Sequence, residues 1–116
     1  MEFLLVYIRE AHPTDDPKMA QKGRTGEGKV GGPDGNIAQP KTYQEREKVA
    51  AACRASLDLE MPFVIDTIDN QVEPIYTGWP ERIYIITTEG KIHYKGEKGP
   101  SGFKPKEAEA SLKKLL

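Results

Sequence analysis

The sequence has little of three things, and each scarcity excludes a class of protein. Its one cysteine, Cys53, cannot form a disulfide within the chain and matches no metal-binding spacing. No apolar run approaches the ~20 residues that a membrane-spanning helix requires. The N-terminus also lacks the basic, apolar and small-residue succession of a secretory signal. We therefore expect no membrane contact and a reducing, cytoplasmic setting.

Neither sign of charge dominates. Seventeen basic and eighteen acidic residues are scattered along the 116 positions, and the formal net charge is -1. A nucleic-acid-binding surface needs clustered lysine and arginine, so nucleic acid is not an expected partner. A chain of this length buries one hydrophobic core, and we predict a single domain over residues 1–116.

The apolar residues that are present predict alternating strands and helices. Residues 3–8 are apolar at every position, which favours a strand buried on both faces. Residues 13–41 mix glycine and proline with polar residues and predict a long flexible loop. Thr42 and Glu45 form a capping box for an amphipathic helix over residues 43–58. The buried stripe expected for that helix consists of Arg46, Val49, Ala50, Cys53 and Leu57.

The next segment predicts a short strand and a short helix. Residues 63–66 have the composition of a second strand. Asp69 and Asn70 are then placed to cap a helical turn that ends at Tyr76.

A β-hairpin and a helix complete the chain. Residues 82–87 and 91–95 predict two strands joined by a turn over residues 88–90. The first arm is apolar on both faces, whereas the second alternates polar and apolar residues and is expected at the sheet edge. A last helix begins at Pro105 and buries Ala108, Leu112 and Leu115. This order of elements is that of an α/β domain.

Residues 23–29 spell part of a phosphate-binding loop. Val30, however, stands where a serine or threonine would hold magnesium, and Gly31, Gly32 and Pro33 cannot open the helix that such a loop requires. We interpret the segment as part of the flexible loop.

Glu10 and His12 directly follow the first strand, at the rim where open α/β folds bind ligands. On a continued strand they share a face, so the carboxylate can orient or charge-stabilise the imidazole. A structural alternative is that His12 ends the strand beside Pro13 while Glu10 is solvated. The spacing alone leaves both interpretations open.

Two further features have a chemical and a plain interpretation. Cys53 lies on the buried stripe of the first helix, where it can be a small apolar residue that fills space or a redox-active thiol. Pro80 follows Trp79 just before the hairpin; an ordinary turn proline there is trans, whereas thioredoxin-like sheets often have a cis-proline at this place.

The segment Tyr7-Ile-Arg-Glu-Ala-His-Pro-Thr-Asp15 resembles the signature of the iodothyronine deiodinase family. Three later blocks and a Gly-Pro pair follow in the family's order, and together they cover nearly all of the chain outside residues 16–38. These blocks are residues 64–70, 79–86, 91–96 and 99–100.

The resemblance implies a fold and a reaction. The fold is α/β and thioredoxin-like or peroxiredoxin-like, with a mixed sheet flanked by helices. The reaction is the reductive removal of halogen from an iodothyronine-like or other halogenated phenol by a selenocysteine or cysteine. An external thiol regenerates the enzyme, and no bound cofactor or metal is implied.

The resemblance also suggests roles for single residues. Glu10 and His12 resemble the acid and the imidazole that hold and protonate the phenolic ring, and Tyr7 looks like a member of the same proton path. The residues that the resemblance places in substrate binding are Trp79, Pro80, Arg82 and Lys98.

Two further positions depart from the family's pattern. Lys98 stands where some members have an arginine, and lysine keeps the charge but lacks the planar fork. Pro40 or its neighbours stand where some members have a second histidine before the first helix, so that histidine's role has no counterpart here.

The largest departure concerns the nucleophile, which in the family precedes the Tyr7 strand in a first strand-helix unit. We expect this unit to lie upstream of Met1, as when a selenocysteine codon is read as a stop, and the chain to be inactive alone. The strands at 3–8 and 82–87 would then pair directly, or a second copy would supply a strand in a homodimer. The alternative function is a non-catalytic module for binding aromatic ligands or for dimerisation.

Overall fold

The computed structural model describes residues 1–16 and 37–116, which form two compact units. The first unit is Met1–Glu73 and the second is Pro74–Leu116, and each is described here by itself. Both combine strands with helices, so the predicted α/β class is confirmed. The organisation of residues 1–116 as one domain stays a prediction.

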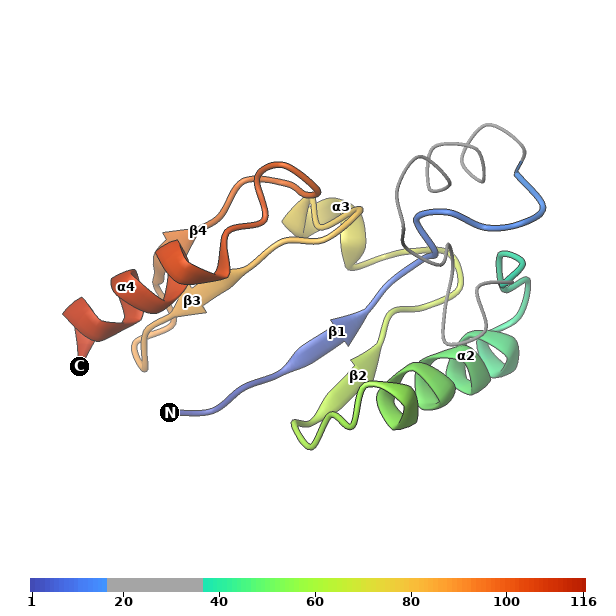
Figure 1. The fold of residues 1–116 in the computed structure, drawn as a ribbon, viewed down its shortest axis with the longest axis horizontal. Coiled ribbons are helices and arrows are strands. Elements are labelled where there is room, and N and C mark those ends of the chain that lie inside the picture. Colours follow the sequence, from blue (N-terminus) through green and yellow to red (C-terminus); the bar gives the residue numbers. More distant parts are fainter. Residues whose placement is uncertain (17–36) are drawn as a thin grey trace. The chain divides into compact units, whose positions relative to one another are not determined.

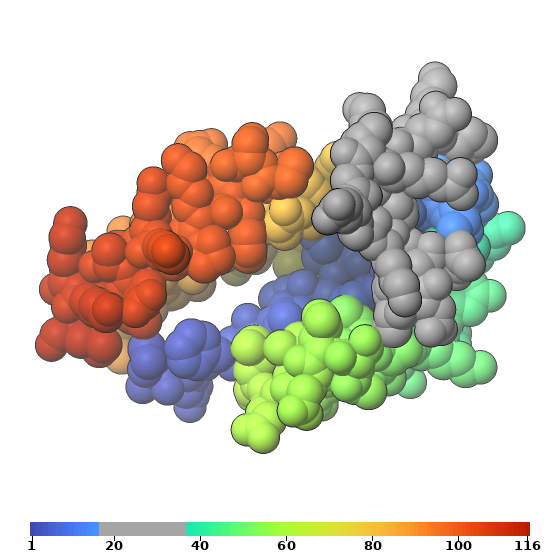
Figure 2. Space-filling model, in the orientation of Figure 1, coloured from blue at the N-terminus to red at the C-terminus, as the bar shows by residue number. Residues whose placement is uncertain are grey.

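The first unit is built on two parallel strands. β1 (Leu5–Tyr7) pairs with β2 (Phe63–Ile65), in a register that sets Leu5 opposite Phe63 and Tyr7 opposite Ile65. α2 (Tyr43–Ser56) runs along β2, and the two elements form one continuous surface in the space-filling view (Figures 1 and 2). The three elements correspond to the strand, helix and strand expected from the sequence.

β1 is shorter and more exposed than predicted. The strand covers Leu5–Tyr7 rather than residues 3–8, and Leu4 and Val6 remain 61% and 40% exposed. Burial on both faces is therefore wrong. The physical reason is that α2 covers only the face that carries Leu5, Tyr7, Phe63 and Ile65.

The start of α2 agrees with the predicted cap. Thr42 Oγ1 accepts a hydrogen bond from the Glu45 amide at 3.1 Å, and the Glu45 carboxylate accepts one from the Lys41 amide at 2.7 Å. In a capping box the Glu45 side chain would accept from the amide of Thr42, whereas here it accepts from the amide of the residue before it. At the other end the predicted burial of Leu57 is wrong: the helix ends at Ser56, and Leu57 is 62% exposed.

The short α3 (Glu73–Tyr76) is capped by a residue that the sequence interpretation did not choose. The buried Asp66 carboxylate accepts hydrogen bonds from the amides of Thr67 at 2.8 Å, Val72 at 3.0 Å and Glu73 at 2.8 Å. The prediction of Asp69 and Asn70 as caps is therefore wrong, because a carboxylate at the end of β2 already meets these amides.

The second unit is the predicted hairpin and helix. β3 (Tyr84–Ile86) pairs antiparallel with β4 (Ile92–Lys95), and Gly90 takes a φ of +79° in the turn between them. α4 (Pro105–Leu115) begins at the predicted proline and contacts both strands. Ala108 is buried as predicted, whereas Leu115 is 42% exposed.

The two strand pairs form separate sheets within the described part of the chain. β1 pairs with β2, and β3 pairs with β4. The predicted direct pairing of the strands at 3–8 and 82–87 would join the two units, and it stays a prediction. The strands of each pair follow one another in the chain: α2 lies between β1 and β2, and a hairpin turn joins β3 to β4. None of the helices in residues 1–16 and 37–116 combines the length and hydropathy of a membrane span.

The Asp66 cap yields a stability prediction. Asp66→Ala leaves three backbone amides without their acceptor in a partly buried turn, and we expect the free energy of unfolding to fall by about 3 kcal/mol. The exposed Asp69→Ala should change it by less than about 0.5 kcal/mol. Urea denaturation followed by circular dichroism measures both, and equal effects of the two variants would contradict the assignment.

Candidate functional site

Tyr7 and Glu10 form a hydrogen-bonded pair at the carboxyl end of β1. The Tyr7 phenol donates to Glu10 Oε1, and the Tyr7 ring stacks on Phe63 with ring centroids 6.1 Å apart. The pairing with β2 ends at Tyr7, where the Asp66 amide donates to the Tyr7 carbonyl at 2.9 Å. Beyond this point the chain bends and returns the Glu10 side chain to the phenol. The first two residues of the predicted proton path therefore meet.

The surroundings of Tyr7 keep its phenol protonated. Burial raises its pKa far above the usual value of 10.0, and the hydrogen bond to Glu10 and the negative charge of that carboxylate raise it further. Arg46 acts in the opposite direction and lowers the pKa. Tyr7 thus lies between charges of opposite sign, and it acts as a hydrogen-bond donor at neutral pH.

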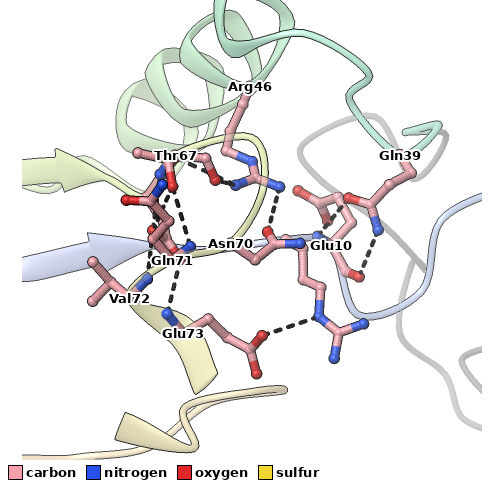
Figure 3. Close-up of polar contacts among 10 residues, drawn as sticks. Glu10, Gln39, Arg46, Thr67, Asn70, Gln71, Val72 and Glu73 are labelled. Carbon is pink, nitrogen blue, oxygen red and sulfur yellow. Dashed lines mark hydrogen bonds and ion pairs between the residues drawn. The ribbon is translucent and has the colours of Figure 1, made fainter. Parts of the chain in front are cut away.

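Gln39 holds the backbone of Glu10. Its Oε1 accepts from the Glu10 amide at 2.9 Å and its Nε2 donates to the Glu10 carbonyl at 3.2 Å (Figure 3). The Gln39 amide in turn donates to Asp15 Oδ1 at 2.9 Å. Sequence reasoning missed Gln39 because it lies 29 positions from Glu10 at the far end of a predicted flexible loop.

Arg46 joins α2 to the turn after β2. Its guanidinium is buried and donates to the carbonyls of Asp66 at 3.3 Å and Thr67 at 2.6 Å and to Asn70 Oδ1 at 2.9 Å (Figure 3). It makes no ion pair within the described residues, although buried charges usually have a charged partner. The dipoles of two backbone carbonyls and one side-chain amide take the place of a charged partner for Arg46. The predicted helix stripe contained Arg46 but gave no sign of these partners.

His12 lies two residues after Glu10 and is half-buried, beside the buried Pro13. A solvated Glu10 is not what the structure shows, since the carboxylate bonds to Tyr7 and the backbone to Gln39. The role of His12 as a proton donor stays a prediction.

Cys53 is half-buried on α2, close enough to Tyr7 and Glu10 for charge interactions with both. Burial raises the pKa of its thiol, and the negative charge of Glu10 raises it further. A reactive thiol has a lowered pKa, so these surroundings favour the protonated, less nucleophilic form. The structure thus brings Cys53 near the Tyr7 and Glu10 pair without activating it.

The residues expected to bind substrate lie close together in the second unit. The Trp79–Pro80 peptide bond is cis. The Gly99 amide donates to the Glu81 carbonyl at 2.9 Å, which brings the loop that carries Lys98 to the segment that begins at Trp79.

Arg82 is engaged with the same unit. Its Nε donates to the Gly96 carbonyl at 2.6 Å, its NH1 group donates to the Thr77 carbonyl at 3.3 Å, and it lies over the Tyr84 ring. These contacts fix the loop around Trp79 to the end of β4. Substrate binding by the four residues Trp79, Pro80, Arg82 and Lys98 stays a prediction.

Other candidate chemistry finds no support among the described residues. Residues 1–16 and 37–116 contain no group of three or more histidine, cysteine and acidic residues that could hold a metal ion. The partial phosphate-binding motif at 23–29 and most of the predicted loop at 13–41 lie outside these residues. A shallow groove of about 430 Å³ lies between α2 and β2, but none of the predicted site residues lines it.

Comparison with known proteins points to one family. The sequence model described as iodothyronine deiodinase matches residues 1–116. Type I iodothyronine deiodinase of Xenopus laevis is 35% identical over 114 residues, which are 97% of this chain and 39% of that protein.

Two thyroxine 5-deiodinases show a similar match. That of Gallus gallus is 35% identical over 103 residues, which are 89% of this chain and 35% of that protein. That of Bos taurus is 31% identical over 114 residues, which are 98% of this chain and 34% of that protein. The chain therefore spans between about a third and two fifths of the length of these relatives.

The raised pKa of Cys53 gives a prediction for its reactivity. At a pH below the pKa, each unit by which the pKa is raised lowers the thiolate fraction about tenfold. Alkylation of Cys53 by iodoacetamide at pH 8 should therefore be slower in the folded than in the urea-unfolded chain. Because Glu10 contributes to the shift, Glu10→Gln should move the midpoint of the rate–pH profile to lower pH. The exposed Glu60→Gln is the control. Equal profiles for the folded and unfolded chains would contradict the shift.

Proposed function

The chain belongs to the iodothyronine deiodinase family, and we propose that it provides the proton-handling part of a reductive dehalogenation of an iodothyronine-like or other halogenated phenol. The observation that carries this proposal is the hydrogen bond between Tyr7 and Glu10 at the carboxyl end of β1. The pair lies in the segment that has the family's signature, and His12 follows two residues later. Support for the reaction class comes from the relatives, which are deiodinases by name.

The reaction requires two electrons and one proton at the ring. A selenolate or thiolate attacks the iodine, the carbon–iodine bond breaks, and the ring carbon takes up a proton. One external thiol displaces iodide from the chalcogen, and a second releases the enzyme as a disulfide forms. The balance is one aryl iodide and two thiols to one arene, one disulfide, iodide and a proton. Glu10, His12 and Tyr7 would hold the phenol and deliver the proton.

The attacking chalcogen is proposed to come from outside these 116 residues. Cys53 is the one cysteine of the sequence, and burial and Glu10 raise the pKa of its thiol. A nucleophile needs the opposite shift. The chain alone is then inactive, and its partners are a small aromatic substrate and a thiol reductant in a reducing, cytoplasmic setting. Trp79, Pro80, Arg82 and Lys98 are the proposed substrate contacts.

A second candidate function is association without turnover, as a binding or dimerisation module. Leu4, Val6 and Val64 are 61%, 40% and 45% exposed on the face of the β1–β2 pair opposite to Leu5 and Tyr7. Leu5 and Tyr7 direct their backbone groups to β2, so those of Val6 point to the opposite edge. An apolar strand with such an edge favours a homodimer through strand pairing.

The proposed reaction can be tested in a chain extended at its N-terminus by a strand-helix segment that carries cysteine or selenocysteine. With dithiothreitol and an iodinated phenol, we expect the extended chain to release iodide and Glu10→Gln to slow this release by about 100-fold or more. Glu60→Gln is the matched control, because Glu60 is exposed and precedes the start of β2, whereas Glu10 follows the end of β1.

Two outcomes would contradict the proposal. No iodide release from the extended chain, or equal release from the Glu10→Gln variant, would remove the proton-handling role. Iodide release by the 116-residue chain that disappears in Cys53→Ser would instead assign the attack to Cys53.

The association is tested at the outer edge of β1. Val6→Pro removes the N–H group that a further strand would bind while the β1–β2 hydrogen bonds stay in place, so a dimer should become a monomer in light scattering. Val6→Ala keeps the N–H group and should remain dimeric. A monomeric unmodified chain, or a dimer that tolerates the proline, would exclude pairing at this edge.

A further inference from the structure

Glu10 needs support that the sheet does not give. The last hydrogen bond between β1 and β2 joins the Tyr7 carbonyl to the Asp66 amide, three residues before Glu10. Strand pairing does not hold a residue beyond the ladder, and fixing the backbone of such a residue costs conformational entropy. Some other group must therefore hold the Glu10 carboxylate where the phenol meets it.

The Gln39 side chain takes the place of a neighbouring strand. Its amide accepts from the Glu10 N–H and donates to the Glu10 carbonyl, so a single planar group binds both backbone groups, as a paired strand residue would (Figure 3). A side chain with only a donor or only an acceptor could form one of these bonds but not both.

Gln39 is itself fixed by the chain around it. Its amide donates to Asp15 Oδ1 at 2.9 Å, and the Thr14 amide donates to the Ile37 carbonyl at 2.9 Å. Pro40 is buried, and Thr42 caps α2 directly afterwards. The position of Glu10 is thus fixed relative to the start of α2.

From these contacts we infer that Gln39 is a positioning residue that holds the Glu10 carboxylate against the Tyr7 phenol. The inference rests on the proposed function, which gives this pair its role in proton transfer. Gln39 acts through Glu10 and is not placed in contact with substrate.

The phenol of Tyr7 reports on this arrangement. The charged or titratable groups that act on it are Glu10 from its own segment and Arg46 and Cys53 from α2. Glu10 raises its pKa and Arg46 lowers it, so withdrawal of Glu10 leaves the effect of Arg46 less opposed. Loss of Gln39 should therefore weaken proton binding by Tyr7 in a folded chain.

The test is a nuclear magnetic resonance measurement on the 116-residue chain with ring-labelled tyrosine. Tyr7→Phe assigns the Tyr7 signal among the five tyrosines, and Glu10→Gln sets the shift that loss of the ionised partner produces. Gln39→Met keeps the size of the side chain and removes both bonds. We expect it to move the Tyr7 Cζ shift at neutral pH in the same direction as Glu10→Gln does, because the phenol loses its ionised acceptor.

Matched variants separate positioning from general damage. Gln44→Met makes the same exchange at an exposed position of α2 and should leave Tyr7 unchanged. Gln39→Asn keeps a neutral amide on a stem one carbon shorter, which should not form both bonds to Glu10, and should produce a shift in the same direction. If Gln39→Met does not fold, this variant decides.

The outcomes distinguish the inference from the proposed function. A Tyr7 shift in Glu10→Gln but none in the Gln39 variants overturns the role of Gln39 and leaves the proposed function standing. No Tyr7 shift in Glu10→Gln means that the pair does not form, which overturns both. Shifts in Glu10→Gln and Gln39→Met, with none in Gln44→Met, support the inference.

Discussion

The first unit depends on a positive charge placed inside it. The guanidinium of Arg46 is 1% exposed, and its three acceptors are two backbone carbonyls and an amide oxygen, all neutral. Because no carboxylate neutralises Arg46 in the described part of the chain, the Asp66 side chain is available to bind the amides that open α3. One buried cation therefore joins α2 to the turn after β2, and a buried anion beside that turn shapes it.

The same arrangement explains the backbone of the turn. Asn70 has a φ of +57°, a left-handed conformation that asparagine tolerates better than most residues, and its side chain accepts a hydrogen bond from Arg46. The charge of Arg46 also reaches Tyr7, where it opposes Glu10. Structural support and the electrostatics of the site thus share one residue.

Local sequence patterns predicted the elements well and their surroundings less well. Thr42 as a helix cap, Pro105 as a first helical residue and the turn at Gly90 follow from backbone preferences that act within a few positions. The burial of Leu4, Val6 and Leu57 was wrong because burial depends on which face another element covers. The Asp66 cap was missed because a carboxylate was sought just before the helix and not at the end of the preceding strand.

For the site, the family's signature located the Tyr7 and Glu10 segment, but the contacts came from distant positions. Tyr7 and Glu10 are three positions apart, and a bend of the chain suffices to bring them together. Gln39 and Arg46 lie far from this segment in sequence, and no periodicity connects an amide or a guanidinium with a backbone carbonyl. Such partners become visible only when the chain is folded.

The hydrogen bond between Thr14 and Ile37 has a consequence for the length of the chain between them. Together with the bond from the Gln39 amide to Asp15, it joins residues 14–15 to residues 37–39 next to the site. The entropy of closing a chain between two such anchors changes only slowly with the number of residues between them. A longer or shorter connection between Asp15 and Ile37 would therefore cost little in closure entropy, and both hydrogen bonds could still form.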